Sequence, residues 1–120
     1  ERHFESLRQE MIRTFTALLD EGQWVVNGHP QARAGHIFNV SFPGIDSETL
    51  LMNLDLAGVA ASSGSACSAG SLQTSHVLQA MNLPEALQRS SIRFSFSPTT
   101  GLQEVRTAAK KTATIVQRHT

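Results

Sequence analysis

Cys67 is the only cysteine of this 120-residue chain, and the run of eleven residues around it, 61–71, otherwise holds only Ala, Ser and Gly. A structural thiol is normally buried among larger apolar side chains, where it packs as a small hydrophobe. These neighbours are too small and polar to form a core, so the sequence predicts a solvent-reachable loop over about residues 61–74. A thiol on such a loop can enter a reaction site, accept an atom and carry it elsewhere.

The sequence next to Cys67 supplies no group that would activate its thiol. Only the thiolate is reactive, and a free thiol is only partly ionised at neutral pH. No charged residue lies within six positions on either side. Either activation comes from another part of the folded protein, for which a Cys–His dyad with His76 or His36 is one arrangement, or the thiol serves as an acceptor of sulfur. An incidental surface cysteine is the remaining interpretation.

Arg93 and Asn39 are the candidate binding residues. Arg93 stands in the middle of an alternating segment, 91–96, on the face that it shares with two serines. Its planar guanidinium can bind a carboxylate through two parallel hydrogen bonds, and a solvated charge on an open sheet face is the equally weighted alternative. Asn39 lies on the polar face of the strand predicted at 36–42, where it lines the same cleft or satisfies neighbouring backbone groups.

Other kinds of site receive little support. One Cys and five scattered His show no paired ligand spacing, so we expect no metal site. Gly64 and Gly70 lack the lysine of a phosphate-binding loop. The adjacent Lys110 and Lys111 do not resemble a buried, activated amine suited to a Schiff base.

Length and composition indicate one domain with a single core. The ten acidic and ten basic side chains balance, so no basic patch predicts binding to nucleic acid or to an anionic membrane. No apolar run approaches the roughly 20 residues of a membrane span. A single cysteine favours a reducing compartment such as the cytoplasm. Because the chain opens on Glu1, we interpret it as the C-terminal part of a longer protein, with removal of a short leader as the alternative.

Hydrophobic periodicity predicts the elements that position these residues. The expected helices are one that begins by Phe4 and ends near Gly22, one capped by Asp46 or Ser47 that stops at Gly58, a short helix capped by Thr74 or Ser75, a helical piece at Pro84, and a terminal helix over 102–116. The expected strands are 24–26, 36–42, 59–61 and 91–96. This order predicts an α+β fold, in which helices pack on a small, mainly antiparallel sheet.

Several motifs resemble one known family, and the resemblance covers nearly the whole chain. They are SSGSACSAGSL at 62–72, SHVL at 75–78 and SIRFS at 91–95, with NGHP at 27–30, NVSFPG at 39–44 and ETLL at 48–51 in support. They resemble the C-terminal small domain of the pyridoxal-phosphate-dependent cysteine desulfurases, which belong to the class V aminotransferase superfamily. The SGSAC form is similar to their long-loop, NifS/IscS-like group.

The resemblance implies a function for the parent protein. Cys67 would attack the sulfur of L-cysteine, leaving alanine and a persulfide, while Arg93 anchors the substrate carboxylate. The persulfide would pass to an acceptor such as an iron–sulfur scaffold protein. The cofactor's lysine and most of its binding groups would lie in a large domain that is absent here, in a parent that is a homodimer. We therefore expect residues 1–120, alone, to be inactive.

Two departures from the family pattern stand out. The segment 96–100 is shorter than usual and lacks an arginine, and Ala34–Gly35 replaces the usual Leu-Pro. The alternatives are a selenocysteine lyase or cystine-cleaving relative, and a non-catalytic module that relays sulfur from another protein.

Overall fold

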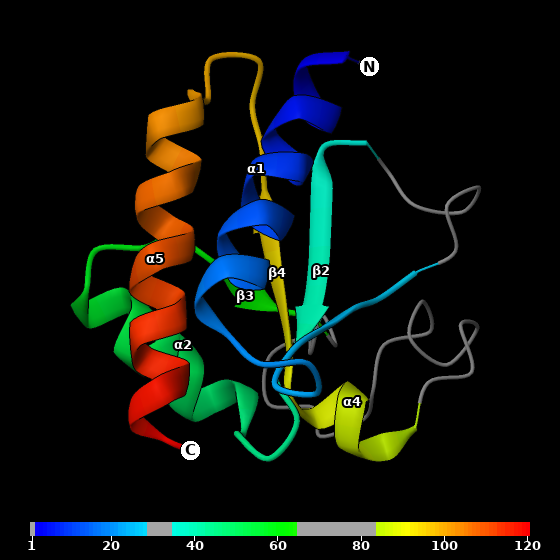
Figure 1. Ribbon diagram of the computed structural model, residues 1–120, viewed down its shortest axis with the longest axis vertical. Coiled ribbons are helices and arrows are strands. Elements are labelled where there is room, and N and C mark those ends of the chain that lie inside the picture. The colour runs from blue at the N-terminus through cyan, green and yellow to red at the C-terminus, as the bar shows by residue number, and fades with distance from the viewer. Residues whose placement is uncertain (1, 29–34, 65–83) are drawn as a thin grey trace.

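The structure is a computed structural model that describes residues 2–28, 35–64 and 84–120. Figure 1 shows the arrangement of its elements. The helices are α1 (Arg2–Leu18), α2 (Ser47–Leu56), α4 (Glu85–Arg89) and α5 (Leu102–Arg118). The strands are β1 (Val25–Val26), β2 (Ile37–Ser41), β3 (Ser62–Ser63) and β4 (Ser91–Ser95).

The four strands form one antiparallel sheet in the order β1-β2-β4-β3. The central pair, β2 and β4, is joined over five residues, with Asn39 opposite Arg93. In Figure 1 α1 lies in front of β4 and α5 lies beside α1. Buried side chains of both helices join those of β2 and β4 in one core, so these helices cover one face of the sheet. The predicted α+β fold with a small antiparallel sheet is confirmed.

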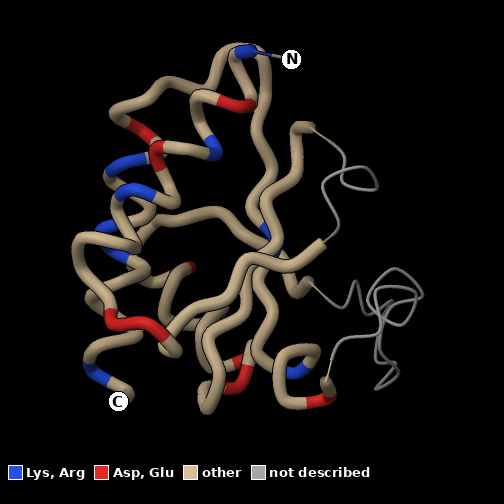
Figure 2. The backbone as a smooth tube through the Cα atoms, turned by 45° about the vertical axis from the view of Figure 1, so that its right-hand side comes forward, with Lys and Arg blue, Asp and Glu red and all other residues tan. Residues whose placement is uncertain are grey.

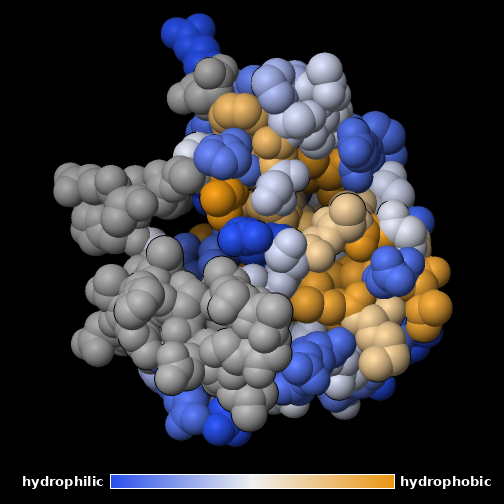
Figure 3. Space-filling view, turned by 180° about the vertical axis from the view of Figure 1, so that it is seen from behind, coloured by the Kyte–Doolittle hydropathy of each residue, from blue (hydrophilic) through white to orange (hydrophobic). Residues whose placement is uncertain are grey.

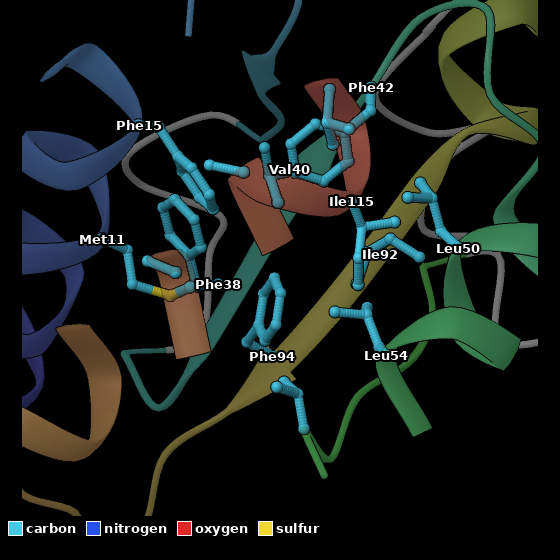
Figure 4. Packing of buried hydrophobic residues seen from close by; sticks show 14 of the residues in the cluster. Met11, Phe15, Phe38, Val40, Phe42, Leu50, Leu54, Ile92, Phe94 and Ile115 are labelled. Atoms are coloured by element: carbon cyan, nitrogen blue, oxygen red, sulfur yellow. The ribbon is translucent and has the colours of Figure 1, made fainter. Parts of the chain in front are cut away.

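The core lies between the sheet and these helices. Phe38 and Val40 from β2 and Ile92 and Phe94 from β4 point toward the helices, as Figure 4 shows. Both helices contribute apolar side chains at three- and four-residue spacing. This spacing puts the side chains on one stripe of each helix, which packs against the sheet. Those of α1 are Leu7, Met11 and Phe15, and those of α5 are Val105, Ala109, Ala113 and Val116.

A polar cluster joins α1 to α5 at the edge of this core. Glu10 is 4% exposed and accepts from Arg106 Nε at 2.7 Å and from Arg13 Nη1 at 2.6 Å. The hydrogen bond from Arg106 is the largest cause that lowers the pKa of Glu10, and the charges of Arg106 and Arg13 act in the same direction, while burial opposes them. The two helices are therefore held together by charge as well as by packing.

One predicted strand is wrong. Residues 59–61 do not pair, and the strand begins at Ser62 instead. The N–H of Val59 donates to the carbonyl of Leu54 at 2.8 Å, and the Val59 side chain is buried, so this segment closes the end of α2 rather than extending the sheet. Asp46 is the cap of α2, because its carboxylate accepts from the N–H of Glu48 at 3.0 Å. The helix predicted after Thr74 or Ser75 lies outside the described residues.

Candidate active site

The face of the sheet turned away from α1 and α5, which we call the open face, carries polar side chains. Alternation along β2 and β4 puts Asn39, Ser41, Ser91 and Arg93 on it, because their neighbours Phe38, Val40, Ile92 and Phe94 fill the core. Figure 3, seen from behind, shows strongly hydrophilic surface in the middle of the molecule, beside the residues drawn in grey. The predicted placement of Arg93 and Asn39 on one polar face agrees with the structure.

Arg93 is the one charged residue in the four described strands. Figure 2 shows that most charged positions lie on the helices instead. Arg93 is half-buried, and its Nε is buried with no hydrogen-bond partner in the described part of the chain. Burying an unpaired charged donor costs free energy, and a carboxylate at this point would recover it.

Arg93 has a strand on each side. Asn39 of β2 is its register partner on one side and Ser62 of β3 on the other. Ser62 belongs to the sequence run that contains Cys67. The pairing therefore attaches the beginning of the cysteine run directly to the strand of the candidate binding arginine.

Gly64 fixes where this run leaves the sheet. Its N–H donates to the carbonyl of Ser91 at 3.0 Å. A Cβ at this position would lie 2.5 Å from Ser91 Oγ and 2.9 Å from Asn39 Oδ1, which is closer than such atoms approach. Glycine is therefore required for the backbone to lie against these two side chains, three positions before Cys67.

Asn27 follows β1 and joins the open face from its other edge. It is 3% exposed, its N–H donates to the carbonyl of Asn39 at 2.9 Å, and its Nδ2 donates to Asn39 Oδ1 at 3.0 Å. The same Nδ2 donates to Ser41 Oγ at 2.7 Å, and Ser41 Oγ donates to the carbonyl of Leu87 at 2.5 Å. Sequence reasoning treated Asn27 only as part of a turn, because its role depends on the pairing of β1 with β2.

Of the other sequence candidates, Cys67 and His76 lie outside the described residues. His36 directly precedes β2 and its carbonyl accepts from Phe96, so it lies at the opposite end of the β2–β4 pair from Gly64 and Ser91. Lys110 and Lys111 lie on α5, across the sheet from Arg93, and Lys111 Nζ donates to the carbonyl of Ala57 at 2.8 Å.

Other sites are few in the described part of the chain. A groove of about 390 Å³ lies between α5 and the segment that follows α2, lined by Val59, Phe94, Phe96 and Val105 among others, and neither Arg93 nor Asn39 reaches it. Among the described residues no cluster of three or more His, Cys, Asp or Glu could hold a metal ion. No described helix is long and apolar enough to cross a membrane.

The sequence is similar to one protein family and to several of its members. The aminotransferase class-V family matches residues 2–107. Cysteine desulfurase 2 of Trichormus variabilis is 45% identical over 93 residues, which are 78% of this chain and 23% of the relative. Cysteine desulfurase IscS of Pseudomonas putida strain GB-1 is 42% identical over 126 residues, which are 96% of this chain and 31% of the relative. The chain thus spans between about a quarter and a third of the length of these relatives.

Two solved structures share the fold. One, titled NifS-like protein, superposes with a TM-score of 0.76 at 24% identity over 98% of this chain and 28% of its own. The NifS-like protein of Rickettsia africae superposes with a TM-score of 0.68 at 22% identity over 96% of this chain and 29% of its own. These two likenesses show the fold, and the match over residues 2–107 establishes that the chain belongs to the aminotransferase class-V family.

Proposed function

We propose that residues 1–120 form the small domain of a cysteine desulfurase, which removes sulfur from L-cysteine and carries it as a persulfide on Cys67. The relatives named cysteine desulfurase support this activity. The observation that carries it is Arg93 on the open face, whose buried Nε has no hydrogen-bond partner among the residues that the structure describes. Arg93 is also paired to Ser62 of β3, the strand that leads into the cysteine run. Under this proposal, the residue that binds the substrate and the strand that leads to the sulfur acceptor would be neighbours in the sheet.

Arg93 would bind the carboxylate of L-cysteine. A guanidinium and a carboxylate form charge-assisted hydrogen bonds, often two in parallel, which fix the orientation of the ligand as well as its position. Asn39 lies opposite Arg93 in the register and provides a second polar group for the same ligand. Held at its carboxylate, the substrate would present its sulfur to a nucleophile at a defined distance from the sheet.

Cys67 would be that nucleophile. Its thiolate attacks the substrate sulfur, so that a sulfur–sulfur bond forms while the carbon–sulfur bond of the substrate breaks. The carbon takes up a proton and leaves as alanine, and Cys67 keeps the sulfur as a persulfide, so atoms and electrons balance. Cys67 follows Gly64 by three residues in the sequence. Gly64 itself lies against Asn39 and Ser91 on the open face.

Family membership implies pyridoxal phosphate, but the residues described here do not fit as its holders. The chain's two lysines, Lys110 and Lys111, lie on the helix-covered side of the sheet, so neither can join the cofactor to a substrate held at Arg93. The lysine and the phosphate-binding groups would come from the large domain of the parent enzyme. We accordingly expect residues 1–120 alone to release no alanine from cysteine.

The remaining features of the proposal concern the parent enzyme. We infer a homodimer that delivers sulfur to an acceptor protein, such as an iron–sulfur scaffold, in a reducing compartment such as the cytoplasm. The single thiol of this chain suits transfer of a persulfide in such a compartment.

Replacing Arg93 tests the proposal in the full-length enzyme. Arg93→Ala should raise the KM for L-cysteine at least about tenfold, because one charge-assisted hydrogen bond contributes roughly 1.5–3 kcal/mol. Arg93→Lys keeps the charge but loses the planar fork, so it should recover part of the affinity. Arg89→Ala is the matched control, since its ion pair with Glu85 is exposed on α4, and it should leave KM unchanged. An unchanged KM for Arg93→Ala would remove this residue from the site.

A further inference from the structure

We propose that Asn27 is a positioning residue, which turns the amide of Asn39 so that its NH₂ end faces the substrate carboxylate beside Arg93. This inference rests on the function proposed above. Asn27 flanks Asn39 on the β1 side, and Arg93 flanks it on the β4 side, because β2 lies between those two strands. Asn39 therefore stands between the group that orients it and the group that it assists.

The orientation follows from the chemistry of each hydrogen bond in turn. The carbonyl of Leu87 can only accept, so Ser41 must donate its single hydroxyl hydrogen there. Ser41 Oγ can then only accept from Asn27, which must present its NH₂ end. The second hydrogen of that NH₂ group is directed to Asn39, so Asn39 must offer its oxygen, Oδ1. The starting point is a backbone carbonyl, whose polarity cannot reverse.

This series of hydrogen bonds also determines which polar atom of Asn39 remains available to a ligand. With Oδ1 accepting from Asn27, Nδ2 is the end of the amide that remains free to donate, and no described residue accepts from it. An amide N–H donates well to a carboxylate, whereas an amide oxygen in the same place would repel it. The same series of hydrogen bonds would thus favour a ligand with a carboxylate over a ligand that offers only hydrogen-bond donors.

One buried polar atom of Asn27 has no hydrogen-bond partner among the described residues, which is unfavourable for folding and is not expected of a network that serves stability alone. Its Oδ1 is buried and has no hydrogen-bond partner within the described part of the chain. Buried polar groups in native proteins are nearly always paired, so an unpaired acceptor calls for an explanation. The orientation that leaves Oδ1 unpaired is the one that fixes Asn39, which is the explanation we infer.

A double-mutant cycle in the full-length enzyme tests this proposal. Asn27→Ala should raise the KM for L-cysteine about threefold to tenfold and leave kcat within about twofold, because it removes part of ground-state binding. Asn39→Ala should have an effect of similar size. The double variant should be no worse than Asn39→Ala, since Asn27 acts only through Asn39. Asn27→Ser, which keeps a donor, should restore part of the affinity and serves if Asn27→Ala does not fold.

Two controls separate the possible outcomes. Asn53→Ala removes a comparable hydrogen bond, from Asn53 Nδ2 to the carbonyl of Thr49, on α2, and should leave KM unchanged. Effects of Asn27→Ala and Asn39→Ala that multiply in the double variant, or a fall in Tm without a change in KM, would overturn the positioning role. If Arg93→Ala also left KM unchanged, the proposed function itself would be wrong, whereas an intact Arg93 effect would confine the failure to Asn27.

Discussion

The two faces of the sheet come from the same strands and differ in almost every physical respect. On the covered face, Phe38 and Phe94 are buried against α1 and α5. On the open face, one position away, Asn39 and Arg93 lie opposite each other, and the Nε of Arg93 has no partner among the described residues. The covered face satisfies its own side chains and stabilises the fold. Among the described residues, the polar atoms of the open face are only partly hydrogen-bonded, which leaves Arg93 Nε available to a ligand.

The largest effect should come from the covered face. Phe38 is fully buried and also packs beneath the guanidinium of Arg8, 5.4 Å from the ring centroid. Phe38→Ala should destabilise the protein by about 3–5 kcal/mol, measured by urea unfolding of the full-length protein. Arg93→Ala should leave the unfolding free energy within about 0.5 kcal/mol. Equal destabilisation by both variants would contradict the assignment of stability to the covered face and of ligand binding to the open face.

The next effect concerns the junction of the open face with the cysteine run. Gly64→Ala should cost about 1–3 kcal/mol, or displace the backbone from Ser91, because the added Cβ overlaps Ser91 Oγ. It should also slow sulfur transfer, since the attachment point of Cys67 moves. Gly35→Ala is the control, because the nearest atom to its added Cβ, on Phe4, lies at an ordinary 3.9 Å. A Gly64→Ala enzyme with normal stability and turnover would show that this close approach is dispensable.

The smallest effect concerns the polar cluster at the edge of the covered face. The pKa of Glu10 is lowered from its ordinary value of about 4.5, chiefly by the hydrogen bond from Arg106. Glu10 therefore stabilises the folded state fully above that ordinary value, and the contribution is lost as pH falls through the lowered value. Glu10→Gln should be less stable than the wild type at pH 7, and the difference should shrink below about pH 4.5 in thermal unfolding. The control Glu85→Gln affects an exposed pair and should matter less. A Glu10→Gln difference that persisted at low pH would point to packing instead of charge.

Alternation in the sequence was enough to assign both faces correctly at β2 and β4. Ile92, Phe94 and Phe96, which alternate with Arg93 in segment 91–96, are buried, and Asn39 and Arg93 share the open face. The role of Asn27 was not predictable, because it depends on which strand lies beside β2, and no local pattern carries that information.

Two further points show the limits of local patterns. The strand predicted at 59–61 was displaced to Ser62–Ser63, because tertiary burial of Val59 outweighed the β propensity of the segment. Gly64 was noted for its residue type alone, and only the structure shows that Ser91 and Asn39 exclude a side chain there. The roles of Cys67, Arg93 and Asn39 remain predictions.

The most direct measurement is the mass of the peptide that contains Cys67, taken without reductant after the full-length enzyme has been mixed with L-cysteine. We predict a gain of one sulfur atom on this peptide, matched by release of alanine, and loss of both sulfur delivery and the added mass in Cys67→Ser. Release of alanine from an enzyme whose Cys67 peptide stays unmodified, or undiminished turnover by Cys67→Ser, would contradict the assignment of this residue as the sulfur carrier.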